Sequence, residues 1–160
     1  MFDFATSAAD KTTIHADLLA AADAITAGEA DGIANMANVA ALIWQFLPDL
    51  NWAGFYRVVE SQLVLGPFQG KAACIRIPIG QGVCGTAAAT RTTQLVKDVH
   101  AFPGHITCDA ASASEIVVPV IADGQLIAVL DLDSPLPARF DEQDARALET
   151  LGQRIGRRLR

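Results

Sequence analysis

Two apolar segments in the second half of the chain place the strongest constraint on its fold. Residues 115–121 and 125–133 are rich in valine, isoleucine and leucine, and Asp123-Gly124 lies between them. Both turn residues tolerate positive φ, as the tight turns of two-residue hairpins require. Residues 126–130 are all apolar, which is typical of a strand buried on both faces of a sheet. We therefore expect a β-hairpin within an antiparallel sheet.

Apolar residues elsewhere recur with helical spacing near both ends of the chain and with strand spacing in the middle. We expect helices at 10–26, 31–47, 82–90 and from Asp141 onward, and further strands at 52–58, 62–68, 73–78 and 93–96. The second helix is expected to carry on one side Ile33, Met36, Ala37, Ala40, Ile43, Trp44 and Leu47. Asp141 and Asp144 have the spacing of a capping box. Hairpins rather than βαβ units predict an α+β domain around an antiparallel sheet, with residues 1–30 as a helical extension packed on it.

The size and charge of the chain argue against several classes of function. At 160 residues and a formal net charge of −6, we expect one domain, 1–160, without the basic face that a nucleic-acid groove needs. No apolar run approaches the roughly 20 residues that span a bilayer, and the N-terminus does not read as a signal peptide. An odd number of cysteines without a secretion signal fits a cytoplasmic location, where a disulfide is more often transient than structural.

The surroundings of the three cysteines, Cys74, Cys84 and Cys108, indicate thiol chemistry. Cys84 lies in a glycine-rich turn, and Cys108 follows Pro103-Gly104-His105 within a long segment, 98–114, that has no clear period. A structural cysteine rarely demands such neighbours, whereas reactive cysteines lie in partly exposed pockets with backbone donors or positive charge. A loop of this length inside a compact domain is more often functional than idle.

Two motifs in this region fall short of known ligand sites. His105-x-x-Cys108 supplies half of a zinc site, but no C-x-x-C motif exists to supply the other half. Gly80-x-Gly82-x-x-Gly85 lacks the Lys-Ser/Thr pair that follows in a phosphate-binding loop. We therefore expect neither a bound metal nor a nucleotide.

Three carboxylates are expected to meet at one end of the hairpin. Side chains alternate along a strand, so Asp131 and Asp133 share a face, and Glu115 opens the partner strand near the same end. Crowded carboxylates repel one another, and some respond by holding a proton near neutral pH. Such a group can act as a general acid, while an ionised neighbour can hold an ammonium group. The alternative is that the two aspartates are turn residues satisfied by backbone donors.

An aromatic pair lies on another expected strand. Trp52 and Tyr56 are four residues apart and therefore share a face, with Gly54 between them. The gap over the glycine would leave room for the apolar part of a ligand between two aromatic walls. The alternative is that both rings belong to the hydrophobic core.

Several segments, together and in order, carry a resemblance to a known family. They include Asn51-Trp52-Ala53-Gly54-Phe55-Tyr56, Leu65-Gly66-Pro67-Phe68-Gln69-Gly70, Gly82-Val83-Cys84-Gly85-Thr86-Ala87, Phe102-Pro103-Gly104-His105, Cys108-Asp109, Ser114-Glu115-Ile116-Val117-Val118-Pro119 and Leu130-Asp131-Leu132-Asp133-Ser134-Pro135. With all three cysteines, these segments resemble the free methionine-(R)-sulfoxide reductases, which are small single-domain GAF proteins. The resemblance covers the chain from about residue 31 to the C-terminal helix.

The resemblance implies a GAF fold, in which helices flank a six-stranded antiparallel sheet. It implies reduction of the R epimer of free methionine sulfoxide to methionine, with no bound cofactor. Thioredoxin, itself reduced by NADPH and thioredoxin reductase, would return the enzyme to its dithiol form. The resemblance also implies a homodimer.

The hypothesis for the site gives each residue a role. Cys108 is expected to be the nucleophile, which becomes a sulfenic acid. By resemblance Cys74 resolves it to a disulfide and Cys84 is the third, supporting thiol. The three carboxylates, Glu115, Asp131 and Asp133, are expected to hold the substrate ammonium or to protonate the S–O group. Trp52 and Tyr56 are expected to enclose the S-methyl group. The substrate carboxylate is expected to bind the backbone amides of Gly82, Val83 and Cys84.

Two rival readings remain at the level of sequence. One is a GAF sensor domain that binds a small ligand without chemistry, although such domains usually accompany kinase, cyclase or DNA-binding domains. The other is an acidic structural or interaction domain whose cysteines are inert.

Overall fold

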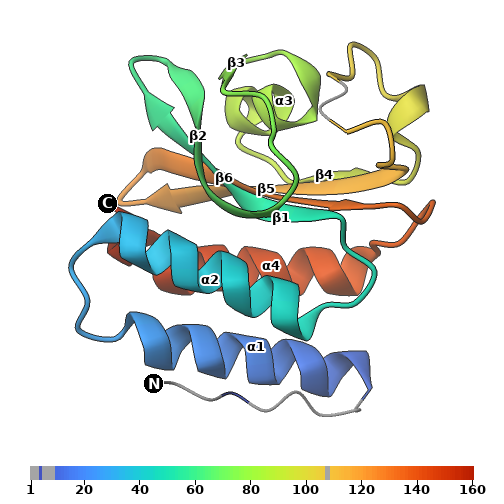
Figure 1. Ribbon diagram of the computed structural model, residues 1–160. Helices are drawn as coiled ribbons and strands as arrows, with labels where there is room; N and C mark the ends of the chain where they lie inside the picture. Colours follow the sequence, from blue (N-terminus) through green and yellow to red (C-terminus); the bar gives the residue numbers. More distant parts are fainter. Residues whose placement is uncertain (1–3, 5–9, 107–108) are drawn as a thin grey trace.

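A single antiparallel sheet forms the centre of the computed structural model, which describes residue 4 and residues 10–106 and 109–160 (Figure 1). Its strand order is β3-β2-β1-β6-β5-β4. The strands are β1 (Trp52–Val59), β2 (Gln62–Gly70), β3 (Arg76–Pro78), β4 (Gln94–Val96), β5 (Ser114–Ala122) and β6 (Gln125–Ser134). The helices are α1 (Lys11–Thr26), α2 (Gly32–Phe46), α3 (Gly82–Thr90) and α4 (Glu142–Ile155), with short 3-10 turns η1 (Val99–Ala101) and η2 (Gly156–Leu159).

The helices lie unequally on the two faces of the sheet. Figure 1 shows α2 and α4 against one face, α1 outside them, and α3 with the connecting loops on the opposite face. The alternation of β6 serves both sides, because Leu130 and Leu132 join the core under α2 and α4 while Val129 joins the core under α3. No helix in the described part of the chain is long and apolar enough to cross a membrane.

Local turn and capping chemistry sets the ends of several elements. Asp123 and Gly124 have φ of 51° and 77°, so the expected hairpin turn between β5 and β6 is confirmed. Asp141 and Asp144 form the expected capping box at the start of α4. The six-stranded antiparallel architecture agrees with the expected α+β class.

Two expectations from the sequence are wrong in detail. The third strand begins at Arg76 rather than residue 73, since the strand register with β2 covers residues 76–78 and Cys74 packs instead against the core under α3. On α2, three residues of the expected side, Ile33, Ala37 and Trp44, are exposed. The buried side of α2 is centred nearer Val39, so these three residues fall outside it.

A buried carboxylate fastens α1 to α4. Asp144 is fully buried and accepts hydrogen bonds from Lys11 Nζ at 2.6 Å and from His15 Nε2 at 3.1 Å. The Arg139 guanidinium is 3.5 Å away. Although burial opposes the ionised form, the hydrogen bonds from His15 and Lys11 lower the pKa of Asp144 to about 2. The charge is therefore retained at neutral pH and holds the two helices together.

The substitution Asp144→Asn is expected to lower the free energy of unfolding at pH 7 by about 2–4 kcal/mol, because it removes the buried anion that pairs with Lys11 and Arg139. The pKa of Asp144 is lower in the folded chain than in the unfolded chain. Its contribution is therefore present above pH 4 and lost as the pH falls through about 2. Urea unfolding at several pH values measures the difference in the free energy of unfolding between the variant and the wild-type chain.

Asp123→Asn, at an exposed ion pair with Arg157, is the control and should change stability by less than about 1 kcal/mol. An equal loss for Asp144→Asn at pH 2 and pH 7 would contradict the assignment.

Candidate active site

Three carboxylates do converge on the α3 side of the sheet. Glu115 on β5 lies opposite Asp133 on β6, and Asp133 in turn lies opposite Trp52 on β1. Asp131 follows in the next row, opposite Gly54. Glu115 and Asp131 are buried, and Asp133 is partly exposed. The alternation of the two strands therefore brings the predicted carboxylates together, as side chains on one face.

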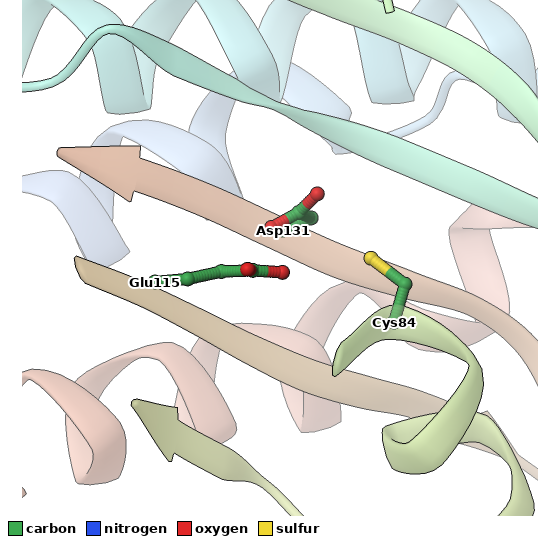
Figure 2. A group of neighbouring side chains, drawn as sticks. All are labelled: Cys84, Glu115 and Asp131. Carbon is green, nitrogen blue, oxygen red and sulfur yellow. The ribbon is translucent and has the colours of Figure 1, made fainter. Parts of the chain in front are cut away.

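Cys84 reaches the same cluster from the first turn of α3. Figure 2 shows its sulfur directed towards Asp131 and Glu115, and the donor atoms of the three residues lie within 4.8 Å of one another. The glycine at residue 85 lets α3 lie against the end of β3. A Cβ on Gly85 would lie 2.5 Å from the carbonyl oxygen of Pro78.

Burial dominates the electrostatics of the cluster. It raises the pKa of Asp131 to about 7, and the thiol of Cys84 and the carboxyl of Glu115, which donate hydrogen bonds to Asp131, oppose this rise. The pKa of Glu115 is raised well above its usual value by burial and then by the charges of Asp131 and Asp133. Burial and Asp131 raise the pKa of Asp133 in the same way. At neutral pH several of these groups therefore hold protons.

The thiol of Cys84 is also held in its protonated form. Burial first, and then the charges of Asp131 and Glu115, raise its pKa well above the usual value. Cys84 is consequently a weak nucleophile in this setting. It is a free thiol, whereas Cys74 is disulfide-bonded. Cys108 lies outside the described residues.

His105 approaches the cluster from the loop before β5. Its Nε2 atom lies 3.8 Å from a carboxylate oxygen of Glu115. Burial and the neighbouring His100 lower the pKa of His105, so the imidazole is neutral at pH 7. The pair is therefore a contact between two neutral groups rather than a salt bridge.

The aromatic pair forms one wall of the site. The ring centroids of Trp52 and Tyr56 are 5.7 Å apart, and Trp52 also stacks on Phe68 at 5.2 Å. The expected gap over Gly54 is wrong, because Phe68 occupies it and a Cβ on Gly54 would lie 2.3 Å from the Phe68 Cβ. The two rings therefore have both expected roles: they belong to the hydrophobic core under α3, and they also line the cavity.

A cavity of about 40 Å³ lies between these groups. It is bounded by the aromatic pair, by all three carboxylates and by the start of α3 at Gly82, Val83 and Cys84. Gln81, at the N-cap of α3, makes no side-chain capping bond. The amides of the first turn have no intrahelical acceptor, so this end of the cavity suits an anionic group.

Two neighbouring residues at the start of β1 hold the loops around the cavity, and sequence reasoning missed this role for both. The Asn51 amide donates to Ser112 at 3.0 Å and to Asp109 at 3.3 Å. The Trp52 indole donates to the Lys71 carbonyl at 3.1 Å. Lys71 and Asp109 also form an ion pair between the two loops at 3.3 Å. No local motif marks these contacts, because they join segments far apart in the sequence.

Comparisons with known proteins agree with this geometry. Residues 34–160 match the family model described as GAF domain. The chain is 52% identical to the free methionine-R-sulfoxide reductase of Escherichia coli (strain K12), with 89% of this chain and 86% of that protein covered. It is 44% identical to the Saccharomyces cerevisiae protein of the same name, with 92% and 87% covered.

A solved structure extends the likeness to the fold. The free methionine-R-sulfoxide reductase from Neisseria meningitidis, in complex with its substrate, superimposes with a TM-score of 0.95 at 45% identity. The match covers 99% of this chain and 96% of that chain. The expected GAF fold is thereby confirmed. By sequence and by fold alike, this chain belongs to the GAF-domain family and, within it, to the free methionine-R-sulfoxide reductases.

Proposed function

We propose that this chain reduces free L-methionine-(R)-sulfoxide to methionine. The observation that carries the proposal is one cavity lined by an aromatic wall, by partly protonated carboxyls and by a helix N-terminus. These features complement the methyl group, the sulfoxide oxygen with the ammonium group, and the carboxylate of the substrate. The named activity of the E. coli and yeast relatives supports the same reaction.

The reaction begins with attack by the Cys108 thiolate on the sulfoxide sulfur. The sulfoxide oxygen gains a proton and passes to the cysteine sulfur, and methionine leaves. Two electrons have then moved from the cysteine to the substrate, and a sulfenic acid remains on Cys108. Attack by Cys74 on the sulfenic sulfur forms a disulfide and expels the oxygen as water.

The raised pKa of Glu115 suits the proton transfer in the first step. Glu115 holds its proton at neutral pH and can give it to the sulfoxide oxygen as that oxygen gains electron density. Asp131, with a pKa of about 7, ionises when an ammonium group enters the cavity. Asp133 lies beside both and shares the ammonium. The cluster therefore acts as proton donor and cation site together.

The remaining walls recognise the rest of the free amino acid. Trp52 and Tyr56 enclose the S-methyl group with apolar surface, and amides at Gly82, Val83 and Cys84 receive the carboxylate. Peptide-bound methionine sulfoxide lacks both free charges, so it would leave the carboxylates and the helix terminus without partners. That loss explains selectivity for the free amino acid.

The different states of two cysteines support their assigned roles. Cys74 is disulfide-bonded while Cys84 is a free thiol with a raised pKa. A thiol that holds its proton is a poor partner for a sulfenic acid, so Cys74 is the resolving residue and Cys84 supports the cluster. Thioredoxin, reduced by NADPH and thioredoxin reductase, then restores the dithiol.

The composition of α2 supports a homodimer. Residues 32–46 include no charged side chain, and the exposed residues of this helix include Ile33, Ala37, Ala41 and Trp44. A surface helix normally turns a charged face to water. A second copy of the chain, packed on this face, would bury it.

The variant Cys108→Ser should lose more than about 10³-fold in turnover of free methionine-(R)-sulfoxide, because it removes the nucleophile. The assay follows NADPH oxidation with thioredoxin and thioredoxin reductase, using the R and S epimers both free and peptide-bound. The wild-type chain should accept only the free R epimer, and Cys84→Ser should still release one methionine per chain without thioredoxin. If Cys108→Ser kept the turnover of the wild-type chain, another residue would have to be the nucleophile. If the wild-type chain bound the sulfoxide without reducing it, a non-catalytic GAF sensor domain would be favoured.

The variant Asp131→Asn should reduce kcat/KM by about 10²–10⁴-fold while making the fold more stable at pH 8. The pKa of Asp131 is raised in the folded chain, so its contribution to stability is full below pH 4 and is lost as the pH rises through about 7. Asparagine cannot ionise, so the gain at pH 8 should be roughly 2–4 kcal/mol and should vanish at pH 4. Urea unfolding and steady-state kinetics measure the two effects.

Asp109→Asn, whose carboxylate pKa is lowered instead, is the control and should not become more stable at pH 8. Unchanged turnover in Asp131→Asn would return this carboxylate to a structural role.

The variant Trp44→Asp should convert a homodimer to monomers, because it places a charge on the apolar face of α2. Sedimentation equilibrium at several protein concentrations measures the mass of both forms. Leu136→Asp changes a residue of similar exposure, 46%, outside α2 and should leave the dimer intact. A wild-type chain that is monomeric at every concentration would rule out the dimer.

A further inference from the structure

The cluster of Cys84, Glu115 and Asp131 has the composition of a metal site. Their donor atoms, one sulfur and two carboxylate oxygens, lie within 4.8 Å of one another, and each residue is at most 6% exposed. Figure 2 shows all three side chains pointing into the same small volume from α3, β5 and β6. Acidic residues that gather on a protein surface are common, but a thiol and two carboxyls that meet inside the protein are not.

A second observation is that one buried oxygen of the cluster has no partner. The Oδ1 atom of Asp131 is buried and has no hydrogen-bond partner. Among the ion pairs of the described residues, none joins a lysine or arginine to Glu115, Asp131 or Asp133. A buried polar atom without a partner costs about 1–3 kcal/mol. A bound cation would supply the missing interaction.

The donor set selects the class of cation. Calcium and magnesium require six or more oxygen ligands and avoid sulfur, whereas zinc takes four ligands from thiolates, imidazoles and carboxylates. His105 Nε2 lies 3.8 Å from Glu115 but outside the group of three donors, so a small movement of its loop would bring it in as the fourth ligand. Ligand atoms around a tetrahedral zinc are separated by about 3.3–3.5 Å, so the donor atoms of Cys84, Glu115 and Asp131 need to close by up to about 1.5 Å.

We propose that Cys84, Glu115 and Asp131 bind one Zn²⁺ ion, with His105 completing the site, when the cavity holds no amino acid. Zinc binding releases the protons of the Cys84 thiol and the Glu115 carboxyl, so its affinity rises with pH. The ion occupies the position proposed for the substrate ammonium and sulfoxide oxygen. It therefore competes with methionine sulfoxide, and this competition alone rests on the proposed function.

Local spacing gives no sign of this site. His105-x-x-Cys108 is the only zinc-like spacing in the sequence, and it uses a different cysteine. Residues 84, 115 and 131 are brought together only by the contact of α3 with β5 and β6. The proposed ligands also include no thiol of the disulfide, so zinc binding does not require reduction of the chain.

The experiment uses the oxidised protein, after thiol titration in denaturant has shown one free thiol per chain. Cobalt(II) serves as the probe because it takes tetrahedral zinc sites and absorbs light. The wild-type chain should give the sulfur-to-cobalt charge-transfer band in the near ultraviolet and tetrahedral bands in the visible, and one equivalent of zinc should remove both. Calorimetry in two buffers should detect proton release on zinc binding.

Matched variants identify the ligands. Cys84→Ser should lose the charge-transfer band, and both Cys84→Ser and Asp131→Asn should bind zinc at least about 100-fold more weakly. Asp109→Asn removes another carboxylate at the rim of the same cavity and should bind zinc like the wild-type chain. Thermal unfolding of each metal-free variant confirms that it is folded before binding is measured.

Three results would overturn the site. They are cobalt binding without a sulfur band, zinc binding by Cys84→Ser at wild-type strength, and equal weakening by Asp109→Asn and Asp131→Asn, which would indicate general attraction to negative charge. The reductase assay on metal-free protein is independent of these measurements. If the chain reduces methionine sulfoxide but binds no cobalt at this site, only the zinc proposal is contradicted. If the chain binds cobalt there but does not reduce methionine sulfoxide, only the proposed function is contradicted.

Discussion

The site depends on ionisable groups that are buried together on the α3 side of the sheet, and no lysine or arginine among the described residues forms an ion pair with them. Glu115, Asp131 and Cys84 would each ionise readily or partly in water, but burial raises the pKa of all three. The folded chain therefore keeps protons at neutral pH that an unfolded chain would release, at the expense of its own stability. The contact between α1 and α4 shows the opposite arrangement. There the charged carboxylate of Asp144 accepts hydrogen bonds from Lys11 and His15, and its charge stabilises the fold. The same fold thus uses buried carboxylates for both stability and chemistry.

Close backbone approach makes this cluster possible. α3 carries no charged residue and begins with small side chains, so it can pack closely on β5 and β6 and against the end of β3. A side chain at Gly85 would clash with the Pro78 carbonyl and the backbone of Gly80, so α3 could not keep its present distance from the end of β3. Phe68 fills the space above Gly54 and stacks on Trp52, which lines the cavity. Both glycines therefore act on the site through packing rather than through their own chemistry.

Features that follow from local pattern were open to prediction from the sequence. The turn at Asp123-Gly124 requires positive φ, and strand alternation alone puts Asp131 and Asp133 on one face, with Glu115 opposite through the hairpin register. Contacts between segments that are distant in the sequence could not be predicted in this way. The approach of Cys84 to Asp131 depends on how α3 packs, and the exposure of Trp44 depends on which side of α2 meets the sheet. The hydrogen bonds of Asn51 to a loop some sixty residues away carry no signature in the sequence.

The contacts of Asn51 and Trp52 have a consequence for the redox cycle. These consecutive residues hold the loop of Lys71 and the loop of Asp109, and a cysteine lies close in sequence to each of those residues, Cys74 and Cys108. The spacing of the two loops is thus set by the rigid end of a β-strand as well as by any covalent link between them. If the disulfide of the proposed cycle joins these loops, the hydrogen bonds of Asn51 and Trp52 would still hold the loops near each other after reduction, which would favour re-formation of the bond.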